Sequence, residues 1–266
     1  MSMKTAVLEY RRLGILRRKV SLIPETWTEL TPEQFVLVAE LYLQRIKTQQ
    51  FLVAFFSLPV QRLDEYQLYN LTKLTEFISD CRTHLDHFIL PQLEHLQAPG
   101  VRLKGMTFEH FMQVDTAFNR YARAEKPELL DRFIALLYLR KGETIVLPPS
   151  HRKGVFSHTK VLNLKRRIQE VASIDPAKKY AVFLNYVFIK RWLSRSFPWL
   201  FPLSDKEPGQ DDQKKKPVAP LVNWLDIFDA FVGDNVAQMD KFQQMPATTA
   251  FRLLNKKIRD AETKKK

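Results

Sequence analysis

The sequence predicts an all-α protein: a multi-helix bundle of repeated helix pairs with a C-terminal helical cassette and at most minor β structure. The first observation is that only seven of the 266 residues are glycine, which sheet-rich proteins use at their turns. The second is the recurrence of apolar residues at three- and four-residue intervals. The third is a near-repeat, in which residues 30–35 and 106–111 each place a threonine before such a segment, as a capped helix does.

A polar segment divides the chain into two parts. Residues 204–220 contain three prolines, one glycine and a run of three lysines, which is typical of a flexible linker. We therefore predict a helical body over residues 1–203, a linker over 204–220, and a C-terminal helical cassette with a basic tail over 221–266.

The first 58 residues are expected to form an extended arm and two helices. Residues 7–20 predict a short strand or arm, and Pro24 predicts a turn. Thr31 has the position of a helix cap, with Pro32 at the first helical position and Gln34 at capping-box spacing. A second helix is predicted over about 47–58, because Pro59 ends it.

A third helix is predicted from residue 63 or 64 to residue 90, and a break within it would fall near 70–72. On such a helix His84 and His87 would share one face, with Asp80 and Asp86 close by. This arrangement is the basis of one hypothesis, a metal-dependent hydrolase. The sequence offers no third ligand, so we predict no metal and no cofactor.

The pattern of a capped helix and a second apolar helix then starts again. After a brief extended stretch at 101–105, we expect helices from Thr107 to about 124 and over 128–139, so that helix pairs recur at 31–58 and 107–140. Residues 143–147 could be extended. Further helices are predicted over about 157–172 and 175–193, the latter with Asp175 as cap and Pro176 first. The cassette should hold three, over 221–232, 235–244 and 251–261, with Thr248 or Thr249 capping the last.

Several classes of protein are disfavoured by the composition. A single cysteine, Cys81, fits a reducing, cytoplasmic setting. Glu9 and the arginines after it interrupt any N-terminal export signal. The longest apolar run, residues 180–189, is shorter than the ~20 residues that cross a bilayer. We therefore expect no membrane association.

The chain lacks recognisable catalytic motifs. It has no glycine-rich phosphate loop, Gly-x-Ser-x-Gly turn, His-Glu-x-x-His pair or Cys-x-x-Cys pair. His110, beside apolar residues on the helix after Thr107, is expected to be structural rather than a catalytic base. We predict a binding protein and no enzyme.

The net charge of +13 is concentrated in three segments: residues 1–20, residues 140–167 and residues 252–266. The middle segment, with eight basic residues and one acid, predicts a basic loop that contacts phosphate or an acidic partner. A solvated loop is the alternative, and charge runs are more often of that kind. The candidate residues are Arg140, Lys141, His151, Arg152, Lys153, Lys165, Arg166 and Arg167, and His158 lies in the same loop.

A basic nucleic-acid-binding protein is the second hypothesis. Aromatic residues make up 12% of the chain and could stack on bases beside arginines, although most lie at helical spacing typical of a core. The positions best suited to stacking on a base are Tyr121 with Arg120 and Arg123, and Trp192 with Lys190, Arg191 and Arg195.

Three short segments carry a family resemblance: residues 27–35, residues 106–111, and residues 224–228 with Met239, Met245–Pro246 and 253–255. They resemble segments of the tail assembly chaperones of tailed phages and prophages, small helical proteins that bind the tape measure protein during tail assembly. The resemblance implies a tape measure-like client or another tail component, held in apolar grooves in the cytoplasm of a bacterial host. Adaptable apolar side chains of the cassette would form the groove, unless they pack the cassette against the body. They are Trp224, Phe228, Phe231, Met239 and Met245.

Overall fold

The computed structural model describes residues 4–12, 14–59, 61–80, 82–145, 160–202, 224–233 and 239–264. These described residues are mostly helical and contain three two-stranded sheets, which confirms the predicted all-α class with minor β structure. The helices are α1 (Pro32–Tyr42), α2 (Thr48–Phe55), α3 (Glu65–Leu74), α4 (Phe108–Ala124), α5 (Pro127–Leu137), α6 (Leu164–Ala172), α7 (Pro176–Ser196), α8 (Trp224–Val232), α9 (Met239–Gln244) and α10 (Ala247–Thr263). The strands are β1 (Lys4–Arg12), β2 (Ile15–Ile23), β3 (Gln92–Leu93), β4 (Leu96–Gln97), β5 (Glu143–Thr144) and β6 (Lys160–Val161).

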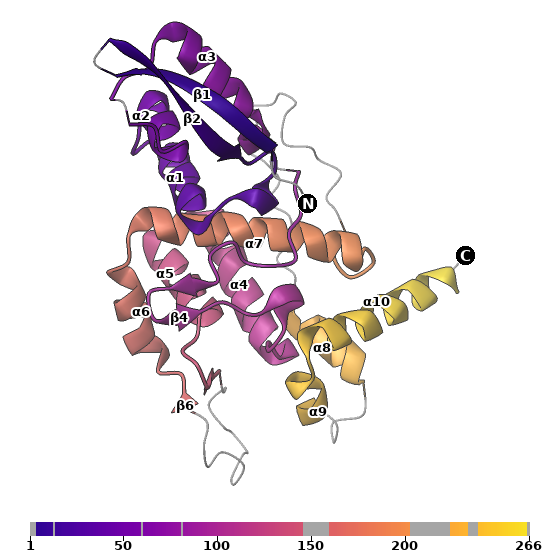
Figure 1. Cartoon of the computed structure of the whole chain (residues 1–266). Coiled ribbons are helices and arrows are strands. Elements are labelled where there is room, and N and C mark those ends of the chain that lie inside the picture. Colours follow the sequence, from indigo (N-terminus) through magenta and orange to yellow (C-terminus); the bar gives the residue numbers. More distant parts are fainter. Residues whose placement is uncertain are drawn as a thin grey trace.

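Helix α7 crosses the middle of the molecule (Figure 1). The β1–β2 hairpin and α1–α3 lie on one side of it, α4–α6 lie on the other, and α8–α10 extend from the α4 side. A helix covered on several sides must be apolar around much of its circumference. The buried residues of α7 accordingly do not form one narrow stripe; they include Ala181, Val182, Tyr186, Phe188, Ile189 and Leu193.

The N-terminal segment is a hairpin rather than the single strand or arm predicted over 7–20. β1 and β2 pair antiparallel, from Lys4 opposite Ile23 to Arg12 opposite Ile15. Gly14, in the turn, has a φ of +77°, the left-handed conformation that glycine favours. Three hydrogen bonds between described residues tie the hairpin to the body. Lys19 Nζ donates to the carbonyl oxygens of Phe56 and Ser57, and Gln67 Nε2 donates to the carbonyl of Glu9.

The three strongest predicted helix starts are confirmed. Thr31 caps α1 in a complete capping box, because its side chain accepts from the Gln34 amide while the Gln34 side chain accepts from the Thr31 amide. Thr107 caps α4 by accepting from the amide of His110. Asp175 caps α7, with Pro176 at its first position. Both expected helix pairs are therefore present, as α1–α2 and α4–α5.

The predicted helix over 64–90 is wrong beyond α3. Helix α3 ends at Leu74, a 3₁₀ turn follows at Glu76–Ser79, and residues 82–91 are not helical. Two physical reasons explain the end. The Thr75 hydroxyl donates to the carbonyls of Leu71 and Thr72, a side-chain bond that weakens helix continuation. Beyond it, backbone groups bond to α7 instead of to each other, as the Ile89 amide does with Asn185 Oδ1 at 2.7 Å.

Three smaller boundaries also differ from the prediction, and for α10 a contact with the body explains the difference. Residues 101–103 form a 3₁₀ turn rather than an extended stretch, and α6 begins at Leu164 instead of 157. Helix α10 begins at Ala247, earlier than a Thr248 or Thr249 cap would place it. The Ala247 amide donates to the carbonyl of Met106 at 3.0 Å, so the body satisfies an amide that a cap would otherwise satisfy.

The C-terminal cassette packs on α4 through aromatic rings. Trp224 of α8 lies edge-on to Phe108 and Phe111, with centroids 6.0 and 5.3 Å apart. Phe251 of α10 lies 4.6 Å from Phe111, also edge-on. The Phe108 amide donates to the carbonyl of Met245 at 2.9 Å. The cassette thus extends the core of the body, and the predicted linker at 204–220 lies outside the described residues.

Candidate functional site

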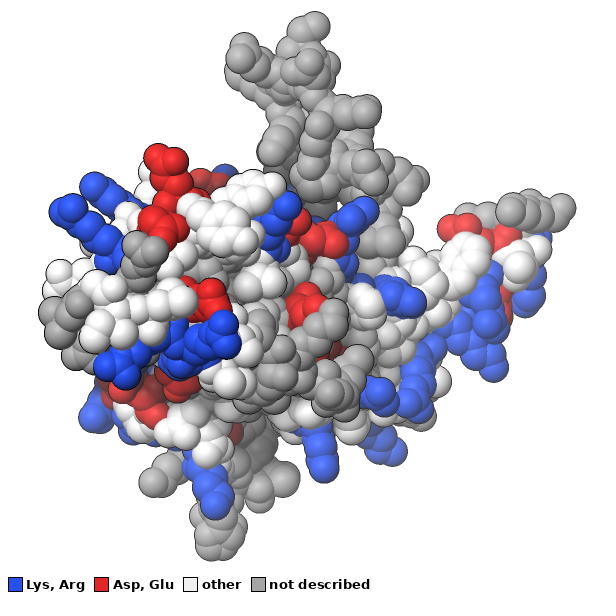
Figure 2. Space-filling view, turned by 45° about the horizontal axis from the view of Figure 1, so that its top comes forward, with Lys and Arg blue, Asp and Glu red and all other residues white. Residues whose placement is uncertain are grey.

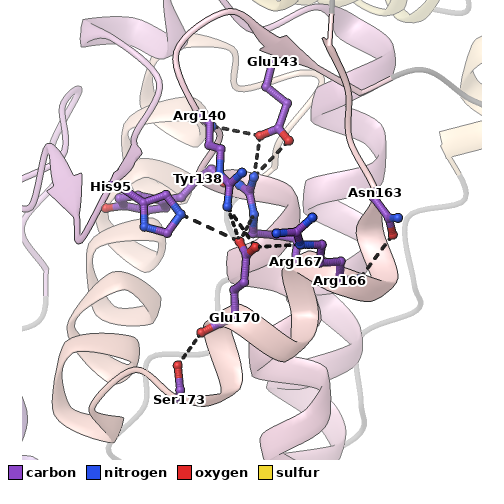
Figure 3. A network of polar contacts seen from close by, with 9 residues as sticks. All are labelled: His95, Tyr138, Arg140, Glu143, Asn163, Arg166, Arg167, Glu170 and Ser173. Atoms are coloured by element: carbon purple, nitrogen blue, oxygen red, sulfur yellow. Dashed lines mark hydrogen bonds and ion pairs between the residues drawn. The ribbon is translucent and has the colours of Figure 1, made fainter.

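The predicted basic segment folds around one carboxylate, Glu170 (Figure 3). Arg140, just after α5, donates through Nη2 to both Glu170 oxygens at 2.8 and 2.9 Å. Arg167, on α6 like Glu170, places its Nε 3.1 Å from Glu170 Oε2 and donates through Nη2 to both oxygens of Glu143. Arg166 and His95 approach Glu170 from farther away, at 3.4 and 3.7 Å.

Arg167 is the buried centre of this network. Its side chain is 3% exposed and also donates to the carbonyl of Tyr138 at 3.2 Å. Burial alone would raise the pKa of Glu170, but the charges and hydrogen bonds of Arg140 and Arg167 lower it below its ordinary value. Carboxylates and a carbonyl already use the donors of Arg167, so its guanidinium is not available to a phosphate in this arrangement.

The other candidates of the basic loop fall into two groups. Lys141 and Lys165 are both exposed, and Lys141 lines a cavity of about 410 Å³ together with Arg140, Arg166 and Asn163. An anion entering this cavity would compete with Glu143 and Glu170 for the same cations. The described part of the basic loop is thus largely an internal ion-pair network. His151, Arg152, Lys153 and His158 lie outside the described residues.

The residues predicted to hold a client lie mainly in the core. Trp224 and Phe228 are buried at 3% and 2% exposure, so they cannot line an open groove in this arrangement. Both rings pack against Phe108 of α4. This is the arrangement of the alternative prediction, in which these residues attach the cassette to the body. Met239 and Met245 are partly buried against the same core, and the Phe231 side chain lies outside the described part.

A buried carboxylate joins the cassette to two helices of the body. Asp115 of α4 is fully buried, and its Oδ1 accepts from Lys190 Nζ of α7 at 2.6 Å and from the Tyr186 hydroxyl at 3.4 Å. Its Oδ2 accepts from Trp224 Nε1 of α8 at 2.9 Å and from Asn119 Nδ2 at 3.0 Å. Burial, with the charge of Asp115 beside it, holds the pKa of Tyr186 well above its ordinary value, so the hydroxyl remains a donor. No local sequence pattern indicates this cluster, because its members come from three helices.

The histidines within the described residues have structural partners. His84 and His87 do not share a helix face, because residues 82–91 are not helical. His84 Nε2 lies 3.3 Å from Arg195 Nη1, and His87 Nδ1 lies 3.1 Å from Asp86 Oδ1. Within the described ranges, no three His, Cys, Asp or Glu residues are grouped as metal ligands would be. His110 is buried, with Nε2 2.8 Å from the Leu136 carbonyl oxygen, and burial lowers its pKa.

The positions singled out for base stacking are not open platforms. Tyr121 is buried, with its ring edge-on to Phe183 at 5.0 Å. Trp192 is partly buried and lies edge-on to Phe197 at 6.3 Å. Lys190 is bound to Asp115, so it is not free to contact a nucleic acid beside Trp192.

The exposed apolar side chains gather at a place that sequence analysis missed. Of twelve large hydrophobic residues that the described structure leaves exposed, seven lie on the hairpin and α3: Val7, Ile15, Leu16, Val20, Tyr66, Tyr69 and Leu74. Four of these, Val7, Leu16, Tyr66 and Leu74, line a cavity of about 400 Å³ between the two elements. Buried Leu58 and Leu71 also line it, and Glu9, Asp64, Gln67 and Asn70 complete the lining. We call this cavity the hairpin groove.

Pairing register explains how the hairpin groove arises. Val7 lies opposite Val20, and Arg11 lies opposite Leu16, so the side chains of Val7, Leu16 and Val20 share one face of the hairpin. Side chains along a strand point alternately to its two faces, and this was the signal available in residues 5–23. Without knowing that the chain turns at Gly14, the alternation could not show which residues of the two strands share a face.

Comparisons with protein-family models, with curated proteins and with solved structures find no match to this chain. Among the helices of the described residues, none combines the length and the apolar character needed to span a membrane.

Proposed function

We propose that this chain is a non-enzymatic helical binding protein that holds an apolar segment of a protein client in the hairpin groove. The resemblance to tail assembly chaperones makes the proposed client a tape measure-like protein or another tail component, met in the cytoplasm of a bacterial host. Because Trp224 and Phe228 belong to the core, the proposed contact moves from the cassette to the hairpin and α3.

The observation that carries the proposal is the concentration of exposed apolar side chains at the hairpin groove. Val7 and Leu16 are 57% and 54% exposed, and Tyr66 is 77% exposed. Large apolar patches on a protein surface are typical of interaction sites. An isolated two-stranded hairpin is also marginally stable, and among the hairpin side chains that the structure describes only Ile23 is buried, so a bound client would stabilise it.

The groove suits an amphipathic segment. Its floor is apolar, at Leu58 and Leu71, whereas Asp64, Gln67 and Asn70 make another part of the lining polar. A helix or strand with one apolar face would bury that face on the floor and keep its polar face in water. Arg18 is paired with Glu9 at 2.9 Å, so the contact we propose is mainly hydrophobic.

The test is co-expression of the full chain with a long helical tape measure protein. We expect the client to stay in the soluble fraction with the wild-type chain. With the variant Val7→Asp/Leu16→Asp, the client should be found in the insoluble fraction. Burial of one valine or leucine contributes about 1.5–3 kcal/mol, so affinity should fall at least about tenfold.

Val101→Asp is the matched control, because Val101 is as exposed as Val7 but lies outside the groove. It should keep the client soluble. Absence of a complex with the wild-type chain, or equal loss with Val101→Asp, would contradict the proposal.

Nucleic-acid binding remains a second candidate because of α10. Arg252, Lys256 and Arg259 lie along the exposed face of this helix. Figure 2 shows blue side chains along one side of the helix projecting at the right, the position of α10 in Figure 1. This candidate predicts binding to unrelated duplexes that weakens steeply as salt is added. No binding at low salt would eliminate it.

A further inference from the structure

A second groove, on the outer face of α1, differs in character from the rest of this basic protein. It has a volume of about 430 Å³ and lies between α1, the segment around β3 and the start of α7. Its lining is mainly apolar, with Val36 and Leu37 of α1 facing Leu90 and Leu93. We call it the α1 groove.

The rim of the α1 groove is acidic. Glu33, Glu40 and Glu94 line it, whereas Lys178 is the single cation of the lining. Lys178 Nζ already pairs with Glu94 at 2.7 Å. Within the described residues, Glu33 and Glu40 have no basic side chain at ion-pairing distance. On a chain of net charge +13, an apolar groove with two unpaired carboxylates favours a basic, partly apolar segment.

The chain itself contains such a segment, the outer face of α10. Arg252, Lys256 and Arg259 follow one another at i, i+4 and i+7, and therefore form one stripe. Leu253, next to this stripe, is 43% exposed, although α10 buries Phe251 and Leu254 against the body. Arg252 and Lys256 have no acidic partner among the described residues. The outer face of α10 thus presents an apolar side chain beside two unpaired cations, Arg252 and Lys256, whereas Arg259 pairs with Asp260.

The groove and the helix of one molecule are too far apart to meet. In Figure 1, α1 lies toward the left of the molecule, whereas α10 projects from it toward the right. A contact between them therefore needs two molecules. It would be heterologous, because the two molecules contribute different surfaces.

We propose that the α1 groove binds the outer face of α10 from a second copy of this chain. Leu253 would lie over the apolar floor, with Arg252 and Lys256 beside Glu33 and Glu40. Each molecule would then keep one groove and one helix free, so association would continue head to tail unless the geometry closes a ring. The proposal does not depend on the hairpin groove, which lies on other elements.

The test is sedimentation velocity of the full, nuclease-treated chain over a range of concentrations. We expect concentration-dependent association that weakens between about 0.05 and 0.5 M salt, because exposed charge pairs are screened. Glu33→Lys/Glu40→Lys and, separately, Arg252→Glu/Lys256→Glu should each raise the dissociation constant about tenfold or more, because two attractions become repulsions.

Mixing the two charge-reversed variants gives the decisive result. Each lacks one wild-type surface and keeps the other, so the equimolar mixture should associate although each variant alone does not. Glu76→Lys/Glu128→Lys, the same charge change at exposed acids outside the groove, should associate like the wild type.

Four outcomes would overturn the proposal. They are a wild-type chain that is monomeric at all concentrations, charge-reversed variants that still associate, a mixture that stays monomeric, and association that disappears with nuclease treatment. The last would assign the basic stripe to nucleic acid. Val7→Asp/Leu16→Asp should associate normally, so failure of the client proposal and failure of this one can be told apart.

Discussion

Replacing Asp115 should release the C-terminal cassette and destabilise the whole protein. Asp115 is fully buried and accepts four hydrogen bonds from α4, α7 and α8. In Asp115→Ala, Lys190 loses its carboxylate, and the Trp224 N–H and the Tyr186 hydroxyl lose their acceptor. Breaking a buried charge pair costs about 3–5 kcal/mol, and an unsatisfied N–H costs about 1–3 kcal/mol more. Lys190 is 22% exposed and regains some hydration, so we expect a loss of about 4 kcal/mol.

A loss of about 4 kcal/mol is a large part of the free energy of unfolding of an ordinary domain. Asp115→Asn is therefore the milder variant, which keeps more of that free energy. Its amide oxygen can still accept from Trp224, but the charge that pairs with Lys190 is gone. We expect a loss between zero and that of Asp115→Ala. Trp224→Phe keeps an aromatic ring beside Phe108 and removes only the indole donor, so its effect should be smaller than that of Asp115→Ala.

Urea unfolding followed by circular dichroism measures these losses, and hydrogen exchange measures the cassette. Asp115→Ala should raise exchange in residues 224–264 more than in α1 and α2, which do not contact Asp115. Lys190→Met should recover part of the loss when combined with Asp115→Ala, since it removes the unpaired charge. A loss below about 1 kcal/mol, or uniform exchange across the chain, would refute this account.

Two further predictions concern the helix cap and the ion-pair network. Thr31→Ala removes the side-chain acceptor of the capping box and should reduce the free energy of unfolding by about 1 kcal/mol in urea unfolding, whereas Thr28→Ala, outside any helix cap, should not. The pKa of Glu170 is lower in the folded chain than in the unfolded chain. Ionised Glu170 therefore stabilises the fold at pH values above its unfolded pKa, and this contribution is lost as the pH falls through its folded pKa. Glu170→Gln should therefore flatten the fall in unfolding free energy below about pH 5, and an unchanged slope would contradict the assignment.

Local signals predicted the local parts of this fold well. The spacing of Thr31, Pro32 and Gln34 indicated a capped helix because a capping box involves only residues three apart. Asp175 and Pro176 indicated the start of α7 for the same reason. The long predicted helix over 64–90 failed because the Ile89 amide bonds to Asn185, a partner 96 residues away that no local pattern reveals.

The candidate site could be predicted less well than the fold. Arg167 looked like part of an exposed basic loop, yet it is buried, and Glu143, 24 residues earlier, is brought onto it with a side chain only 9% exposed. Trp224 and Phe228 looked suited to a client, but α4 covers them. Whether a side chain is exposed depends on what packs over it, and a single sequence does not show that.

The sequence by itself determined that the chain is helical, where its capped helices begin, and that its charge is strongly positive, because these properties depend on composition and on residues within one helical turn. Tertiary structure alone decided which cations are neutralised, which aromatic residues are buried, and where apolar side chains remain exposed. Those outcomes depend on contacts between elements far apart in the chain, such as Asp115 with Trp224 and the hairpin with α3. The physical reason is that burial and charge pairing are set by neighbours in space.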